Sequence, residues 1–159
     1  MDEVVGNSNF QSDCINLLQQ NKKTTNEPNF KEKWYSLEED HPFQDFSLQM
    51  LNVAGTFFDL SSCVGYEFWT HNNTRPRGWH IDQDQKLVNT TGQTRFPLCS
   101  VVYYVKVEDL KGGKLHIEDD VITPKSNRMV TFSPKLNHCV EPFMGERITL
   151  CVNPWSVQL

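Results

Sequence analysis

The spacing of apolar residues changes from a helical repeat to a two-residue repeat near Leu60. In the first part, an apolar run follows Ser8, which is a suitable N-cap, and the run ends where residues 19–29 become polar. Its members recur at helical spacing and are Phe10, Cys14, Leu17 and Leu18. This pattern predicts a short first helix followed by a loop.

A longer apolar stripe begins after Pro42, a residue suited to the first turn of a helix. Its members, three or four positions apart, are Phe43, Phe46, Met50, Val53 and Phe57. A helix with this spacing has one continuous apolar face, which is typical of a helix that covers a sheet. We therefore expect its aromatic side chains to belong to the core and not to a cofactor site.

Beyond Leu60, apolar and polar positions alternate, and glycine or proline marks several of the breaks. The predicted strands are residues 63–70, 78–82, 96–107, 114–118, 128–133, 137–141 and 147–153. A chain of 159 residues falls within the usual size of one domain. We expect a single domain over residues 1–159, with a helical buttress at 1–60 and a mainly β core at 61–159.

Composition narrows the classes of function. A hydrophobic content of 38% is typical of a folded protein, and a formal net charge of −5 gives no general attraction to phosphate backbones. No nucleic-acid partner is therefore expected. The sequence has neither a secretory signal nor an apolar run long enough to span a membrane, and its five cysteines form no C-x-x-C pair. We expect reduced cysteines, no membrane association and a cytoplasmic location.

The residues His80, Asp82 and His138 suggest a metal centre. On an extended segment, His80 and Asp82 point the same way, so both side chains can face one ion. A two-layer or closed β architecture is needed to bring the distant His138 to them. Two imidazoles and one carboxylate are the ligands that hold non-haem Fe(II) with positions left open. His116 could act as a fourth metal ligand, but its place in a predicted strand favours a partly exposed histidine without metal.

Five blocks of sequence carry a resemblance to a known family. Around the metal motif and after it, they read Gly78-Trp79-His80-Ile81-Asp82, Val102-Tyr103-Tyr104-Val105, Gly112-Gly113-Lys114-Leu115, Met129-Val130-Thr131-Phe132, and Asn137-His138 with Gly145-Glu146-Arg147-Ile148-Thr149. In order and approximate spacing, these blocks resemble the Fe(II)/2-oxoglutarate dioxygenases, and most of all their prolyl-hydroxylase-like branch. The resemblance implies a double-stranded β-helix, a jelly-roll or cupin-like barrel, with N-terminal helices against one sheet.

The resemblance also implies roles for individual residues. His80, Asp82 and His138 would bind Fe(II), and 2-oxoglutarate would chelate the metal before O₂ binds. Arg147 would pair with the distal carboxylate of 2-oxoglutarate, and Tyr104 would donate its hydroxyl to the same group.

Side-chain alternation bears on these roles. Arg147 and Thr149 share one face of a strand, so the Thr149 hydroxyl can join a guanidinium that meets a carboxylate through two hydrogen bonds. A surface ion pair of Arg147 with Glu146 or Glu141 is the alternative. Only one residue of a consecutive tyrosine pair can enter the pocket. The resemblance selects Tyr104, whereas the alternation leaves open a role as an ordinary strand aromatic.

The resemblance implies a hydroxylase that acts on an unactivated C–H bond and releases succinate and CO₂. The substrate would be a prolyl residue or peptide, or a small amino-acid-like molecule. The alternatives are a metal-binding β-barrel scaffold and a cupin-like enzyme that does not use 2-oxoglutarate. The side chains before the metal motif, Trp69, Arg75, Arg77 and Trp79, can form a pocket rim, although a solvated loop explains them better. The polar composition of residues 83–95, with Gly92, permits motion as a lid.

Overall fold

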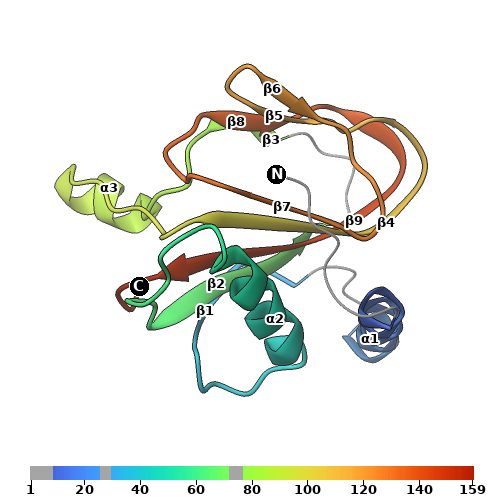
Figure 1. Cartoon of the computed structure of the whole chain (residues 1–159), viewed down its shortest axis with the longest axis horizontal. Helices are drawn as coiled ribbons and strands as arrows, with labels where there is room; N and C mark the ends of the chain where they lie inside the picture. Colours follow the sequence, from blue (N-terminus) through green and yellow to red (C-terminus); the bar gives the residue numbers. More distant parts are fainter. Residues whose placement is uncertain (1–8, 26–29, 72–76) are drawn as a thin grey trace.

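The computed structural model describes residues 9–25, 30–71 and 77–159, which form nine strands and three helices (Figure 1). The helices are α1 (Phe10–Thr25), α2 (Gln44–Ala54) and α3 (Gln85–Thr91). The strands are β1 (Lys33–Ser36), β2 (Gly65–His71), β3 (Arg77–His80), β4 (Ser100–Gly112), β5 (Leu115–Ile117), β6 (Asp120–Ile122), β7 (Arg128–Phe132), β8 (His138–Val140) and β9 (Phe143–Trp155). Within these ranges no helix has both the length and the apolarity that a membrane span requires. Ser8 and Arg75 lie outside the described residues.

The strands build two antiparallel sheets that lie face to face (Figure 1). The larger sheet has the order β1-β2-β9-β4-β7, and the smaller sheet has the order β3-β8-β5-β6. From β2 onward, and apart from the β5–β6 hairpin, each strand is followed by a strand of the other sheet. This connectivity is that of a jelly roll, or double-stranded β-helix, and it confirms the predicted fold class.

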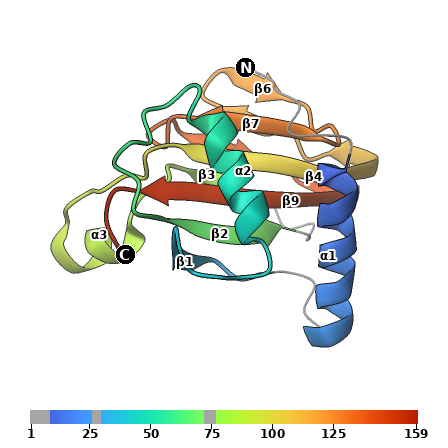
Figure 2. The ribbon, with the colours of Figure 1, turned by 60° about the horizontal axis from the view of Figure 1, so that its bottom comes forward.

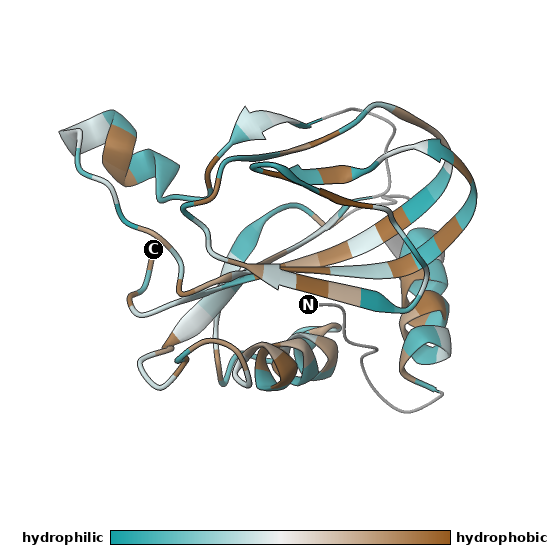
Figure 3. Cartoon of the chain, turned by 45° about the horizontal axis from the view of Figure 1, so that its top comes forward, coloured by the Kyte–Doolittle hydropathy of each residue, from teal (hydrophilic) through white to brown (hydrophobic). Residues whose placement is uncertain are grey.

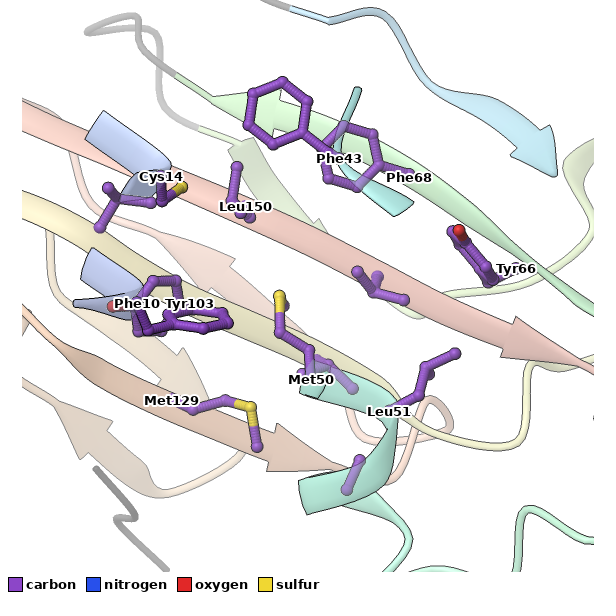
Figure 4. Close-up of a cluster of buried hydrophobic side chains, with 14 of the residues drawn as sticks. Phe10, Cys14, Phe43, Met50, Leu51, Tyr66, Phe68, Tyr103, Met129 and Leu150 are labelled. Atoms are coloured by element: carbon purple, nitrogen blue, oxygen red, sulfur yellow. The ribbon is translucent and has the colours of Figure 1, made fainter. Parts of the chain in front are cut away.

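Helices α1 and α2 cover the outer face of the larger sheet (Figure 2). Apolar side chains of the helices meet those of the sheet in one core (Figure 4). Phe10 of α1 meets Tyr103 of β4 edge-on, with ring centroids 5.1 Å apart. Phe43, which precedes α2, stacks on Phe68 of β2 at 5.3 Å. Such aromatic pairs stabilise a fold by about 0.5–1.5 kcal/mol each beyond the burial of their area.

The opposite face of the larger sheet looks into the space between the sheets. There, Val102 and Tyr104 of β4 pack with Leu115 of β5 and Phe132 of β7 in a second apolar cluster. Polar and apolar positions alternate along the long strands (Figure 3). The prediction that the two tyrosines of β4 lie on opposite faces is therefore confirmed, because Tyr103 belongs to the helix-side core.

The helices differ from the sequence-based prediction at their ends. Helix α1 continues to Thr25, through part of the segment predicted as a loop. Glutamine and lysine favour a helix without giving it an apolar period, so the periodicity could not reveal this extension. Helix α2 ends at Ala54, before Phe57, and Phe58 packs against the core instead.

Three short elements were missed. Strand β1 lies within the first sixty residues, which were expected to be helical, and it adds an edge strand beside β2. Strand β6 forms a hairpin with β5. The segment considered as a lid contains helix α3, which begins at an Asp84 cap whose side chain accepts from the Leu87 N–H, and which ends at Gly92 in the left-handed region. The two strands, of four and three residues, are too short to display a period, and α3, with seven residues, spans only about two helical turns.

The longest strand pairing, between β4 and β9, has one register shift between Tyr104 and Lys106 and a second irregularity between Glu108 and Lys111. Gly145 of β9 lies at this irregularity with φ at +99°, and a Cβ there would come within 2.3 Å of the Asp109 carbonyl oxygen. Only glycine allows the two backbones to approach so closely.

We expect Gly145→Ala to lower the free energy of unfolding by about 2–4 kcal/mol, because the methyl group meets backbone atoms and the positive φ is strained. Urea denaturation measures the loss. Gly92→Ala is the matched control, since Gly92 also has a positive φ of +72° but open space around its Cβ position. It should cost only about 1 kcal/mol. Equal losses in the two variants would contradict the importance of the close approach.

Candidate metal centre and active site

Three side chains with metal-ligating atoms converge at the junction of β3 and β8. His80 ends β3, Asp82 follows it, and His138 begins β8. The antiparallel pairing of the two strands sets His80 opposite His138. The ligand atoms of all three residues lie within 4.8 Å of one another, and Oδ1 of Asp82 is 3.7 Å from Nε2 of each histidine. The structure thus brings together the three residues that the sequence predicts as ligands.

Both imidazole rings are held in the same way. Nδ1 of His80 is 2.7 Å from the Gly78 carbonyl, and Nδ1 of His138 is 3.0 Å from the Leu136 carbonyl. A carbonyl only accepts, so each Nδ1 carries the proton and each Nε2 keeps a free lone pair. Burial, and then the positive charge of Arg77, lower the pKa of His80. Both effects favour the neutral imidazole, which is the form that binds metal.

Asp82 is held by one hydrogen bond to its carboxylate and one from its backbone. Ser100 of β4 donates its hydroxyl to Oδ2 at 2.6 Å, and the Asp82 N–H donates to the Pro134 carbonyl at 3.0 Å. Asp82 is 8% exposed and Ser100 is 1% exposed. One oxygen of the carboxylate is therefore engaged by Ser100, while the other faces the two histidines.

The pocket that contains these three residues continues between the sheets to Arg147 and Thr149 of β9. Arg147 is only 6% exposed. Its guanidinium carbon lies 5.2 Å from the ring centroid of Tyr104 and 5.6 Å from that of Phe143. Its Nε is buried without a hydrogen-bond partner, and no described carboxylate forms an ion pair with it. A cation buried in this way leaves room for an anionic ligand.

Tyr104 and Thr149 are also buried, but they differ in their relation to the pocket. Thr149 lines it, whereas Tyr104 contacts the Arg147 guanidinium without being part of the lining. The Tyr104 hydroxyl is buried without a partner. Burial raises the pKa of Tyr104, and the positive charge of Arg147 partly opposes that rise. At neutral pH this hydroxyl is thus a hydrogen-bond donor beside a cation.

The alternative partners that the sequence left open are engaged elsewhere. Glu146 pairs with Lys106, and Glu141 pairs with His116 at 2.6 Å, so neither carboxylate neutralises Arg147. His116 is not among the residues that converge with His80. The structure therefore does not support a surface ion pair of Arg147 or a fourth ligand at His116.

Sequence reasoning missed two polar side chains beside the metal centre, Ser100 and Glu67. Ser100 shares the inner face of β4 with Val102 and Tyr104, so its phase was visible in the alternation, but its contact with Asp82 was not. Glu67 alternates with Tyr66 along β2 in the same manner and lines a cavity next to His80. The signal in both cases is a polar residue at an inward position of a strand.

Solved structures with this fold include two prolyl hydroxylases. A prolyl-4-hydroxylase from Pseudomonas putida matches with a TM-score of 0.68 at 15% identity, covering 99% of this chain and 92% of that chain. The viral collagen prolyl hydroxylase of Paramecium Bursaria Chlorella virus-1, solved with 2-oxoglutarate, matches with a TM-score of 0.60 at 15% identity, covering 99% and 96% of the two chains. These likenesses show a shared fold.

Among curated proteins, the chain is 29% identical over 127 residues to beta-glucuronidase of Canis lupus familiaris. The match covers 78% of this chain, which spans 18% of the length of that relative. The family model of the 2OG-Fe(II) oxygenase superfamily matches residues 67–155, which is more than half of the chain and contains all three metal-ligating residues. The resemblance read from the sequence is thereby confirmed, and the chain belongs to the 2OG-Fe(II) oxygenase superfamily, whose enzymes use Fe(II), 2-oxoglutarate and O₂.

Proposed function

We propose that this enzyme hydroxylates an unactivated C–H bond of a prolyl residue, a peptide or a small amino-acid-like substrate, and that it releases succinate and CO₂. The observation that carries the proposal is the presence, in one pocket, of a three-residue metal-ligand group and a buried arginine without a carboxylate partner. The first feature suits Fe(II), and the second suits a dicarboxylate.

His80, Asp82 and His138 are the proposed iron ligands. Their fit rests on the two Nδ1 hydrogen bonds, which leave both Nε2 atoms free, and on the Nε2 of His80, which is buried without a partner. Two imidazoles and one carboxylate leave half of an octahedron available to other molecules. When bound, Fe(II) with 2-oxoglutarate and O₂ supplies the oxidant that converts C–H to C–OH.

Arg147 is the proposed counter-charge for the distal carboxylate of 2-oxoglutarate. A guanidinium stays protonated when buried and presents paired N–H donors in the geometry of a carboxylate. The Tyr104 ring contacts the guanidinium and Thr149 lines the same pocket, so their hydroxyls are the proposed further donors. Because the hydroxyl of Tyr104 is unpartnered and that of Thr149 has only a weak 4.0 Å contact from the Cys151 thiol, both can turn to a ligand.

The remaining groups orient the ligands and keep water out. Ser100 holds one oxygen of Asp82, and the backbone carbonyls hold the two imidazoles. Part of the pocket wall is apolar and is formed by Val102, Leu115, Phe132 and Val140. A dry wall strengthens the attraction between the Arg147 cation and a bound carboxylate.

We also propose that the chain acts as a single domain, because the larger sheet joins β1 from the N-terminal part to strands of the barrel. The cytoplasmic location stays a prediction. A scaffold or a cupin-like enzyme is disfavoured, since neither needs a buried cation opposite the metal ligands.

The first test is anaerobic titration of the purified protein with Fe(II) and 2-oxoglutarate, followed through the visible charge-transfer band of the chelate. The band should require both additions and should vanish in His138→Ala. Arg147→Gln should still bind Fe(II) but should weaken 2-oxoglutarate binding by a factor of about 100 or more, because a buried charge pair loses one partner.

The matched control is Arg95→Gln, which removes an arginine whose ion pair with Asp84 lies outside this pocket. It should leave the band unchanged. Bound iron without any band would overturn the use of 2-oxoglutarate and favour the cupin-like alternative. An unchanged 2-oxoglutarate affinity in Arg147→Gln would refute the role of that residue.

A second prediction concerns Ser100. Ser100→Ala should weaken Fe(II) binding by about 10–100-fold, because the Asp82 carboxylate loses the hydrogen bond that orients it. Competition with a metal-sensitive dye measures the affinity. Ser47→Ala, at an equally buried serine of α2 on the helix side of the sheet, is the control and should not change it. Equal affinities of Ser100→Ala and the wild type would show that Asp82 is oriented without Ser100.

A further inference from the structure

A second cavity lies beside the metal centre and shares His80 and Asp82 with the pocket of Arg147. We call it the side pocket. Its other lining side chains include Glu32, Glu67, Trp69, Arg77, Trp79 and Asn153. It therefore combines carboxylates and a guanidinium with aromatic rings, and two of the proposed iron ligands form part of its wall.

Glu67 enters the side pocket from the inner face of β2. Its neighbours Tyr66 and Phe68 face the helix-side core, so alternation turns Glu67 the other way. Its Oε2 accepts a hydrogen bond from Nε1 of Trp155 at 2.8 Å. Burial, followed by the negative charge of Glu32, raises the pKa of Glu67 to about 7. Among the described residues no cation forms an ion pair with it, although a half-buried carboxylate is stabilised by one.

Arg77 enters the side pocket because of a β-bulge. Arg77 pairs with Val140 and His80 pairs with His138, so two residues of β3, Gly78 and Trp79, lie opposite the single residue Cys139 of β8. Simple alternation would send Arg77 to the face opposite His80, but the extra residue brings both to the same side. Arg77 accordingly lines both pockets. It forms no ion pair with a described carboxylate, Glu67 included.

Trp69 provides an independent indication of a ligand. It follows Glu67 on the inner face of β2 and lines both pockets. The residue is 8% exposed, and its Nε1–H is buried without a hydrogen-bond partner. A buried donor without an acceptor is unfavourable by about 1–3 kcal/mol, so its retention beside a cavity indicates that a bound molecule supplies the acceptor.

We propose that the side pocket binds a zwitterionic, amino-acid-like substrate, with its protonated amine on Glu67 and its carboxylate on Arg77 and the Trp69 N–H. A ligand of one charge would be attracted by one of these two residues and repelled by the other, whereas a zwitterion satisfies both. This inference rests on the proposed function, because the shared wall at His80 and Asp82 sets such a substrate beside the iron.

The test measures succinate release from 2-oxoglutarate in the presence of each of the free L-amino acids. For every amino acid that stimulates release, the N-acetyl and C-amide derivatives are compared with it. Glu67→Gln should raise KM by about tenfold or more for the free amino acid and leave KM for the N-acetyl derivative unchanged. Arg77→Gln should likewise raise KM for the free amino acid, and it should leave KM for the C-amide derivative unchanged.

Glu38→Gln and Arg95→Gln are the matched controls, because they remove the same charges at positions that do not line the side pocket. The charge-transfer band of Fe(II) with 2-oxoglutarate is recorded on every sample. If the band forms and no free amino acid stimulates release, the zwitterion proposal is wrong and the proposed function stands. Equal losses on free and capped substrates would also overturn it. If the wild type forms no band, both proposals fail.

Discussion

The antiparallel pairing of β3 with β8 is the constraint on which the metal centre depends. It sets His80 across from His138, and the turn after β3 then brings Asp82 to both. Neither histidine is left to rotate, because backbone carbonyls two residues earlier hold both rings. A slip of one residue in this pairing would turn one imidazole to the opposite face of the sheet. The geometry of the metal centre therefore depends on the register of β3 and β8.

The larger sheet can hold such a site because one of its faces stabilises the fold while the other lines the pocket. One face packs against α1 and α2 in an apolar core that contains stacked and edge-on aromatic rings. The other face carries Ser100, Arg147 and Thr149 into the pocket. Burial of the first face supplies the stability that offsets the unpaired polar atoms of the second. Strands β4 and β9 take part in both, because their successive side chains alternate between the core and the pocket.

Four of the described buried polar atoms that lack partners lie around the pockets, namely Nε2 of His80, the Tyr104 hydroxyl, Nε of Arg147 and Nε1 of Trp69. Three others, on Trp34, Ser47 and Thr131, do not line these pockets. A fold selected only for stability would not collect the first four there, because each is unfavourable when it is buried alone. Their arrangement is consistent with an iron ion, a dicarboxylate and a substrate that each satisfy a different part of the same interior. The family match supports the first two of these ligands.

Local periodicity in the sequence predicted which residues of a regular strand or helix share a face. It identified the apolar stripe of α2, the common phase of His80 with Asp82, and the common phase of Arg147 with Thr149. Together with the family resemblance, it also anticipated the barrel. Periodicity carries no information about which distant strands pair, or where a bulge shifts their register. For that reason only the tertiary structure could bring Ser100 to Asp82 and turn Arg77 inward, since both depend on contacts between strands far apart in the chain.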